Sequence, residues 1–482
     1  MRALPFAPAK APTFGGVKRS PRQSSSQLTA RLGTLAALCL TACLPAQAEN
    51  LVELYQLAKG YDATYLSARA QAEATQFQVE QAYALGRPTL GLTAGINRTR
   101  YDSAASPSAA TQALAQAQGL GPVSYDASAT TKSLGLQGKY PLYNPGNNAK
   151  ISQAEQQLRL VQADLKMAED DLTARLAKAY FDVLSAQDVL TTSQANKKAL
   201  AEQLAAAKRS FEVGNATITD TREAQARFDL AEAQDVAAAN DLRVKRIALD
   251  QLVGKTDVQP TPLRSPAGLD KLAPGAMDDW VSQAAGSPVV QKANIALDVA
   301  RLEIDKARAG NLPTVDAVGS VSRSDVDTSN STYKNSAGAG TTYVIGAQMN
   351  LPLYAGGAIQ NRIKEVLRLQ DKAERDRENA IRQVTLTTRQ AYAAVQSGQA
   401  QVKALEAAEA SAKLALEATQ LGYRVGVRIN KDVLDAQTLL ANTQKDLFKA
   451  RYDVIVGSVR LKQAAGNLKA EDLDELNAML VR

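Results

Sequence analysis

The stretch from Asn147 to Phe211 contains neither glycine nor proline, and it constrains the fold more than any other feature of the chain. Alanines and larger apolar residues recur along it every three or four positions with one stutter, which is the pattern of helices packed as a coiled coil. One continuous helix of this length would span roughly 100 Å. A second such stretch runs from about Ala358 to Leu421 and is interrupted only by Gly398. These stripes predict the core of a helical bundle and carry no chemistry by themselves.

The sequence is an internal duplication. "FEVGNATITDTREAQ" at 211–225 and "YRVGVRINKDVLDAQ" at 423–437 share a V-G pair, an aspartate and an A-Q pair, 212 residues apart (423 − 211). "AYFDVLSAQ" at 179–187 and "AYAAVQSGQ" at 391–399 share the same offset. A repeat of this kind indicates one structural unit used twice. We therefore expect two structural repeats, 49–265 and 266–482, each with helix, strand, loop, strand, long helix, turn and helix.

In four segments of about ten residues each, apolar residues alternate with small or polar ones, as in strands with one apolar face. They lie at about 89–98, 133–140, 314–323 and 343–351, and polar loops at 101–128 and 324–340 join them in pairs. Four strands cannot close a membrane barrel, which needs about eight. Strands that span a membrane would therefore come from several chains. The alternative is a small periplasmic β-layer flanked by helices. Three tyrosines where strand gives way to helix fit an interfacial aromatic girdle: Tyr140, Tyr143 and Tyr354.

Residues 1–48 have the pattern of a secretory signal peptide. They carry six basic residues and no acid, then the apolar run "LGTLAALCLTACL", then "AQA" at Ala46–Ala48 before Glu49. We expect cleavage after Ala48; the alternative is a lipoprotein box at Leu40–Cys43, with Cys43 lipidated. Most of the net charge of +7 belongs to this leader, because the remaining residues hold 50 (56 − 6) basic and 49 acidic side chains. The charge therefore does not indicate a nucleic-acid partner.

The residue types that most enzymes need are missing from the sequence. There is no histidine, and both cysteines, Cys39 and Cys43, lie in the leader. This excludes histidine-assisted nucleophiles and removes the commonest metal ligands from the mature chain. No nucleotide-binding or hydrolase motif is present, and no apolar run is long enough for a transmembrane helix. We expect no enzyme, no metal and no cofactor; the rival classes are an exported enzyme and a periplasmic coiled-coil structural protein.

In combination, these features resemble the TolC family of outer-membrane efflux and type I secretion channels. The resemblance rests on the signal peptide, the duplicated halves, the strand exits "PLYNPG" and "PLYAGG", and the two V-G turns, and it covers the chain from about Glu49 to Leu480. It implies an α+β membrane protein in which each chain of a homotrimer gives four strands to a 12-stranded outer-membrane β-barrel. A long periplasmic α-helical barrel would continue it. The implied partners are outer-membrane lipid, a periplasmic adaptor protein and an inner-membrane ABC exporter or RND-type pump.

The resemblance also implies a gate at the periplasmic end. Its residues here would be Thr219 and Asp220 of the first turn and Tyr423 and Arg428 of the second, bonded across neighbouring hairpins. Such charge-assisted hydrogen bonds are able to bias an element with two states. The physical alternative for Thr219 and Asp220 is that they are ordinary helix-start residues, and for Tyr423 and Arg428 that they are solvated.

Asp432 and Asp435 would form a second part of this site, a ring of carboxylates facing the lumen. Their spacing of three residues places both on one helix face, and such rings attract cations and exclude anions. The alternative for Asp432 is a helix start in which Asn430 is the N-cap and Asp432 the second helical residue. Asp435 lies beyond the first turn, where the dipole no longer explains it. The neighbouring Lys431 weakens the ring at Asp432.

Overall fold

The structure is a computed structural model that describes residues 50–101, 107–119, 127–214, 216–264, 269, 272, 275–328 and 338–481. The expected signal peptide and Cys43 lie outside the described residues. The α-helices are α2 (Leu51–Tyr61), α3 (Ala63–Tyr83), α4 (Ala109–Ala117), α5 (Pro145–Glu212), α6 (Ile218–Val253), α7 (Met277–Ala284), α8 (Pro288–Ala309), α9 (Ala358–Arg424), α10 (Asn430–Ala464) and α11 (Glu471–Asn477), with a 3₁₀ helix η1 (Ala84–Gly86). The strands are β1 (Thr89–Tyr101), β2 (Ala127–Tyr143), β3 (Thr314–Thr328) and β4 (Gly338–Asn350).

The two predicted long helices are confirmed as α5 and α9. Helix α5 has 68 residues and begins at Pro145, where Asn144 accepts a hydrogen bond from the backbone N–H of Asn147 and proline occupies the first turn. Proline is favoured there because its missing N–H would have no partner in the helix anyway. Helix α9 has 67 residues and continues through Gly398. A Cβ at Gly398 would come within 2.8 Å of Val454 on α10, so glycine allows these two helices to approach closely.

The four predicted strands form one antiparallel sheet in the order β1-β2-β3-β4. All four are found, and they are longer than expected because pairing continues past the alternating segments, as between Tyr101 and Ala127. The expected polar loop at 101–128 is partly wrong. It contains helix α4, which Ser108 begins by accepting the backbone N–H of Thr111, and its two ends belong to strands. The loop expected at 324–340 is likewise shortened by β3 and β4.

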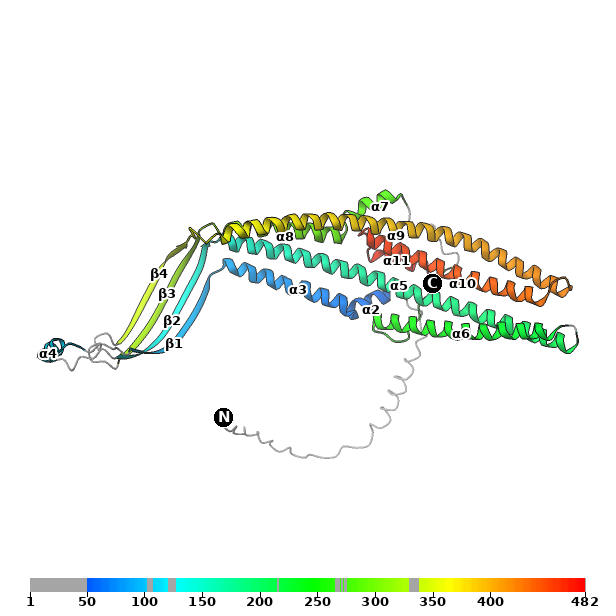
Figure 1. Ribbon diagram of the computed structural model, residues 1–482, viewed down its shortest axis with the longest axis horizontal. Helices are drawn as coiled ribbons and strands as arrows, with labels where there is room; N and C mark the ends of the chain where they lie inside the picture. Colours follow the sequence, from blue (N-terminus) through cyan, green and yellow to red (C-terminus); the bar gives the residue numbers. More distant parts are fainter. Residues whose placement is uncertain are drawn as a thin grey trace, which may run out of the picture. The chain divides into compact units, whose positions relative to one another are not determined.

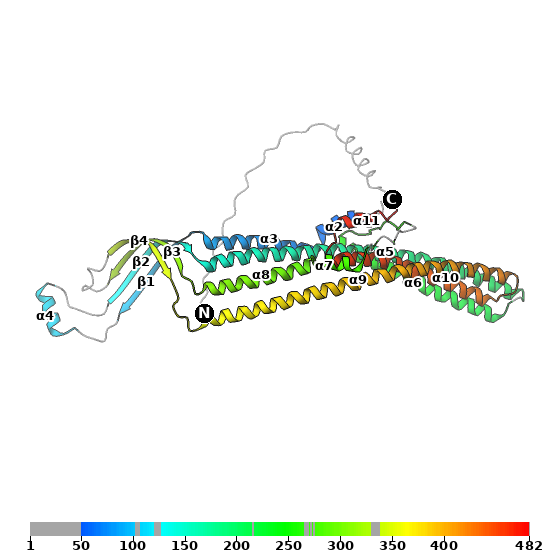
Figure 2. The ribbon, with the colours of Figure 1, turned by 90° about the horizontal axis from the view of Figure 1, so that it is seen from above.

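The long helices run side by side, and the sheet extends from one end of them (Figure 1). Two pairs of shorter helices lie end to end beside the long ones: α8 with α10, and α3 with α6. Helices α8 and α10 each pack between α5 and α9, and they meet where a Cβ at Gly466 would lie 2.5 Å from Ser287. Helices α3 and α6 both pack on α5, and Gly254 after α6 meets Tyr61, the last residue of α2, whose ring would lie 2.4 Å from a Cβ at Gly254. Figure 2 shows the same neighbours from above. The elements of the two repeats therefore appear in the expected order, while the boundary at 265/266 stays a prediction.

The largest cluster of buried apolar residues joins α2, α5, α6, α10 and α11. Phe181 of α5 packs against Tyr180 and against Tyr452 of α10, and all three are buried. The hydroxyl of Tyr180 donates to the carbonyl of Thr261 and accepts the N–H of the same residue at 2.8 Å, and burial raises the pKa of Tyr180 to about 12. The C-terminal segment joins this core, because Leu480 bridges to Leu263. This core anchors the segment after α6 and the C-terminus to the long helices.

Closer to the sheet, one carboxylate ties three helices together. Glu303 of α8 accepts Nε2 of Gln153 on α5, Nζ of Lys306 on its own helix and a guanidinium nitrogen of Arg362 on α9. Burial alone would raise the pKa of Glu303, but these donors outweigh burial and lower it to about 2. The ionised form is therefore the one that holds α5, α8 and α9 together.

Candidate functional site

The two turns far along the helices from the sheet carry the residues singled out by the sequence. Helix α5 ends at Glu212 and α9 ends at Arg424, and each is followed by a glycine with positive φ: 78° at Gly214 and 80° at Gly426. Glycine takes this left-handed conformation without the Cβ clash of other residues, so it ends each helix and reverses the chain. The turns thus create two helical hairpins, α5–α6 and α9–α10 (Figure 1).

The first turn is closed by its own residues. Thr217 is the N-cap of α6, and its hydroxyl accepts the backbone N–H of Asp220 while Asp220 accepts the N–H of Thr217 at 2.9 Å. This is a reciprocal capping box, which satisfies two backbone donors at the helix start. Asp220 is therefore a helix-start acid in this chain, as the physical alternative expected. Thr219 is exposed, and its side chain makes no hydrogen bond within the described residues.

The second turn has no such cap, because Ile429 occupies the position that corresponds to Thr217 (429 − 212). Ile429 is the N-cap of α10 and has no side-chain hydrogen bond. The expectation that Asn430 is the N-cap is wrong: Asn430 is the first helical residue, it is 5% exposed, and its amide nitrogen has no partner. Its side chain packs inside the structure and so cannot reach back over the helix end. Asp432 is consequently the third helical residue, where its charge favours the helix dipole, but no capping box forms with it.

Arg428 lies in this second turn and points its charge at Asp432. Its Nη1 is 3.6 Å from Oδ2 of Asp432, and its side chain is 62% exposed. The backbone N–H of Arg428 donates to the carbonyl of Gly422, and a Cβ at Gly422 would come within 2.8 Å of Cγ of Arg428. Glycine at 422 therefore makes room for the arginine stem. Tyr423 beside it is half-buried.

The structure brings Asp435 together with a residue that the sequence did not single out. Nη2 of Arg227 on α6 lies 2.6 Å from Oδ1 of Asp435 on α10, which joins the two hairpins of one chain. Arg227 follows Glu223, the counterpart of Asp435 in the first repeat, by four residues. On sequence alone this spacing indicates an ordinary pair on one helix. Only the pairing of α6 with α10 reveals the contact.

The predicted gate residues are not joined to each other within one chain. Among the described residues, neither Thr219 nor Asp220 has a hydrogen bond or ion pair with Tyr423 or Arg428. Beneath the turns, a small apolar cluster packs α5, α6 and α10 together; its buried members include Ala207, Ala224 and Leu434. The small alanines let the hairpins approach closely, so the two turns are held as neighbours.

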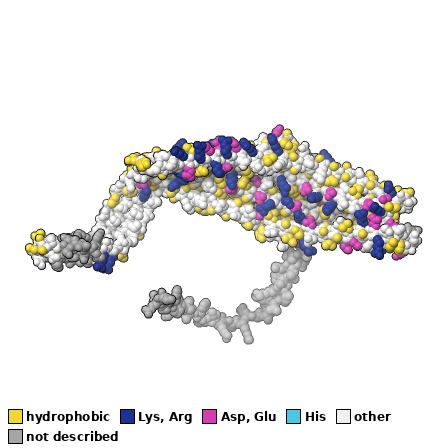
Figure 3. Space-filling view, viewed as in Figure 1, with side chains coloured by type: hydrophobic (Ala, Val, Ile, Leu, Met, Phe, Trp, Pro, Cys, Tyr) yellow, Lys and Arg dark blue, Asp and Glu magenta, His cyan; other side chains and the backbone are white. Residues whose placement is uncertain are grey.

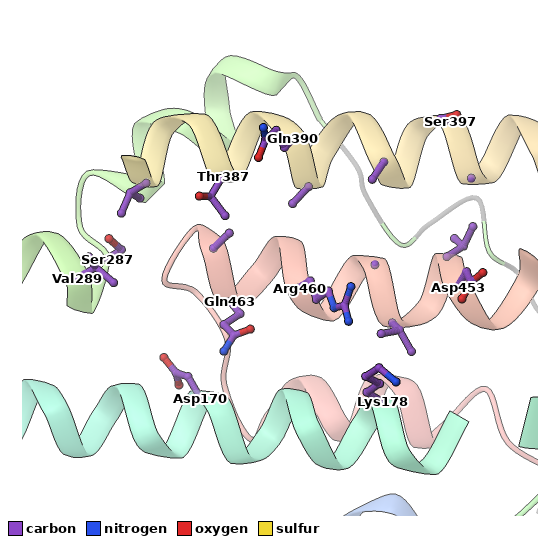
Figure 4. Close-up of a pocket in the computed structure, with 18 of the residues that line it drawn as sticks. Asp170, Lys178, Ser287, Val289, Thr387, Gln390, Ser397, Asp453, Arg460 and Gln463 are labelled. Carbon is purple, nitrogen blue, oxygen red and sulfur yellow. The ribbon is translucent and has the colours of Figure 1, made fainter. Parts of the chain in front are cut away.

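A cavity of about 970 Å³, lined by both apolar and polar side chains, opens between α5, α9 and α10, near the start of α8 (Figure 4). Its lining includes Asp170 and Lys178 of α5 and Asp453 and Arg460 of α10. Burial raises the pKa of Asp170, whose carboxylate lies 2.9 Å from Nζ of Lys166. No nucleophile paired with a general base lines the cavity, and no cluster of three or more potential metal ligands occurs in the described part of the chain.

No described helix is long and apolar enough to cross a bilayer.

Comparison with known proteins decides the family. The family model described as outer membrane efflux protein matches residues 54–255 and 280–467. The outer membrane protein TolC of Vibrio cholerae is 33% identical over 461 residues, covering 94% of this chain and 97% of that protein. The chain belongs to the outer membrane efflux protein family. This family consists of outer-membrane channel proteins, and the chain is accordingly an outer-membrane protein of the TolC type.

Two further comparisons bear on this family. The alkaline protease secretion protein AprF of Pseudomonas aeruginosa is 30% identical, covering 90% of this chain and 87% of that protein. The crystal structure of the outer membrane protein VceC from Vibrio cholerae matches with a TM-score of 0.71 at 19% identity, covering 86% of this chain and 96% of that one. The structural likeness shows the fold, a long helical hairpin pair with a four-stranded sheet. The resemblance inferred from the sequence is confirmed.

Proposed function

We propose that three copies of this chain form one channel, in which a 12-stranded β-barrel crosses the outer membrane and the helices continue it as a periplasmic α-helical barrel. The observation that carries the proposal is the open sheet. Strands β1 and β4 have 13 residues each, and each is paired on one side only within the described residues. In a bilayer unpaired backbone groups cost several kcal/mol each, so such edges must close on other sheets.

The two faces of the sheet differ as the inside and outside of a barrel do. One row across all four strands is Leu92, Leu136, Val321 and Tyr343, and every member is exposed. The neighbouring row on the other face is Thr93, Gly135, Ser322 and Thr342. Ile345 on the apolar face is 94% exposed. Lipid would cover the apolar face, and the polar face would line a water-filled lumen. In Figure 3 charged side chains gather over the helices and are sparse over the strands.

The channel would serve as the exit duct of a tripartite exporter and would move its cargo without chemistry. A relative named for alkaline protease secretion supports type I protein secretion, and the family description supports multidrug efflux. The partners would be a periplasmic adaptor protein and an inner-membrane ABC exporter or RND-type pump. The two turns offer the adaptor an apolar surface, since Val213, Val425 and Val427 are each at least 66% exposed.

The turns would form the gate of this channel. Tyr423 and Arg428 of one chain would form hydrogen bonds with Thr219 and Asp220 of the neighbouring chain. Within one chain, among the described residues, Thr219 and Asp220 have no partner on the second hairpin, so they remain available to the neighbouring copy. The exposed guanidinium of Arg428 is free to make such a bond alongside its long contact with Asp432. Asp432 and Asp435 would line the narrowed lumen as acidic rings, with Arg227 modulating the charge of Asp435.

Disulfide trapping tests the closed barrel. Thr93→Cys on β1 is combined with cysteine at Val344 on β4 or two residues to either side, after serine replaces Cys39 and Cys43. Within one chain these strands are three spacings apart, about 14 Å, which no disulfide bridges. A covalent trimer on a denaturing gel supports the barrel. Thr93→Cys with Gly135→Cys, which face each other in one chain, is the control and should stay monomeric.

Conductance tests the channel itself. Purified trimers added to a planar bilayer should give discrete single-channel steps. A chain that forms no β1–β4 cross-link at any of the three positions, and gives no steps, would instead be a non-channel periplasmic coiled-coil protein.

A further inference from the structure

On β1, β2 and β3 the apolar face of the sheet ends at successively different heights, and a basic residue follows each end. Toward the loops, the apolar face ends at Ile96 on β1, Leu134 on β2 and Val321 on β3. The next residue on the same face is basic on each of these strands: Arg98, Lys132 and Arg323. All three basic side chains are exposed. On β4 the apolar Tyr343 is followed by Thr341, so three of the four strands carry the charge.

The register places these three cations on one diagonal line. Ile96 faces Lys132, and Leu134 faces Arg323, so the boundary moves two residues along the strand from β1 to β2 and again from β2 to β3. On β4 it stays level with β3, because Val321 faces Tyr343. Diagonal neighbours of this kind lie about 7–8 Å apart, close enough for one anionic group to contact two of them. Strands of membrane barrels are tilted by about 35–45°. Across β1, β2 and β3, a boundary that advances in step with the strand tilt lies level in the membrane.

The three cations on this line, Arg98, Lys132 and Arg323, form no ion pair among the described residues. Two exposed acids, Asp325 and Asp327, share the face, and Asp325 is the cross-strand partner of Lys132. Both acids lie farther along β3 from the apolar band than Arg323, so the first charge beyond the band is positive on each of the three strands.

The opposite end of the band is built differently. There the exposed residues are Tyr140, Tyr143 and Tyr354, which are 44%, 46% and 88% exposed. The nearby Lys139 points to the polar face, where it binds Asp316 at 2.7 Å. Aromatic rings suit an interface of either charge, whereas a line of cations suits anionic headgroups. The two ends of the band therefore fit leaflets of different lipid composition.

We propose that Arg98, Lys132 and Arg323 bind the phosphate groups of a phosphorylated glycolipid in the outer leaflet, whose acyl chains cover the apolar band. The proposal rests on the membrane placement given above for the sheet. Guanidinium groups bind phosphate oxygens through two parallel hydrogen bonds, and the lysine adds a point charge. A free phosphate ion lacks the acyl chains that the adjoining apolar rows would hold.

Native mass spectrometry of the full detergent-solubilised protein tests this site with two probes, bis-phosphorylated lipid A and the same lipid after removal of its phosphates. A basic residue near an anionic surface contributes about 1 kcal/mol, which is about a fivefold change in affinity. Lys132→Gln with Arg323→Gln should therefore weaken binding of the phosphorylated lipid about 25-fold. The dephosphorylated lipid should bind the wild type and this variant equally weakly. Lys150→Gln, at the start of α5 beyond the other end of the band, is the control for loss of a positive charge outside the site and should change nothing.

Three results would overturn the site: equal binding of the two lipids, an equal loss in the Lys150→Gln control, or full competition by millimolar inorganic phosphate, which would indicate a site for the free ion. The same preparations are measured in planar bilayers of zwitterionic lipid. Normal conductance of the wild type with no lipid preference refutes the lipid site alone, whereas absence of conductance in the wild type refutes the channel.

Discussion

The contact between Arg227 and Asp435 is the most direct test of how the hairpins are held. Arg227→Gln keeps most of the side-chain length and removes the charge that lies 2.6 Å from the Asp435 carboxylate. Because the pair joins α6 to α10, its loss leaves the ends of the two hairpins near the turns held by the apolar cluster beneath them, while the larger core farther along the helices is unchanged. We expect the variant to open more readily and to bind multivalent cations at Asp435 more tightly.

The expected magnitude follows from the exposure of the pair. The two side chains are 32% and 49% exposed, so solvent screens the interaction, and such pairs contribute about 0.5–1 kcal/mol. Three copies around a trimer axis act together if all hairpins move in one step, which gives about 1.5–3 kcal/mol for the closed state. The ratio of open to closed channels should then rise about 10- to 100-fold.

Single-channel recording in planar bilayers measures this ratio. Arg227→Gln and Asp435→Asn should each raise the open fraction, and the double variant should open no more than either alone, since both remove one contact. Arg222→Gln is the matched control, because Arg222 is an exposed arginine on the same helix. An open fraction equal to wild type in Arg227→Gln, or additive effects in the double variant, would show that the contact does not hold the closed state.

Three other changes test the gate and the helical layer. Arg428→Ser should raise the conductance of the closed channel, because the exposed guanidinium no longer reaches a neighbouring chain; unchanged conductance would count against the gate. Asp432→Ala with Asp435→Ala should reduce cation preference, read from the reversal potential in a salt gradient, and block by trivalent cations. The pKa of Glu303 falls from 4.5 to about 2, so its ionised form adds at most about 3 kcal/mol of stability above pH 4.5, lost as pH falls toward 2. Glu303→Gln should lower the thermal midpoint at pH 7 and much less at pH 3, by circular dichroism.

The sequence predicted the elements well where a long pattern repeats and poorly where one side chain decides. Freedom from glycine and proline located α5 and α9 to within three residues at every end. Helix α4 was missed because its nine residues lie in a polar segment too short to show a period. The start of α10 was wrong because asparagine is a good N-cap by propensity, whereas here the packing of Asn430 buries its amide. No pattern within one segment could pair Arg227 with Asp435, since that contact depends on how α6 and α10 pack.

The two copies of the duplicated motif differ in what their aspartates contact. In the first repeat Oδ2 of Asp220 accepts the backbone N–H of Thr217 in a capping box. In the second, Ile429 has no hydroxyl to accept a backbone N–H and makes no capping box with Asp432, whose carboxylate lies 3.6 Å from Arg428. Restoring the hydroxyl with Ile429→Thr should draw Asp432 into a second capping box, stabilise the start of α10 by about 1 kcal/mol and withdraw one carboxylate from the ring. Trivalent-cation block should then weaken without loss of the Asp432 charge. Block equal to wild type would show that Asp432 does not contribute through its free carboxylate.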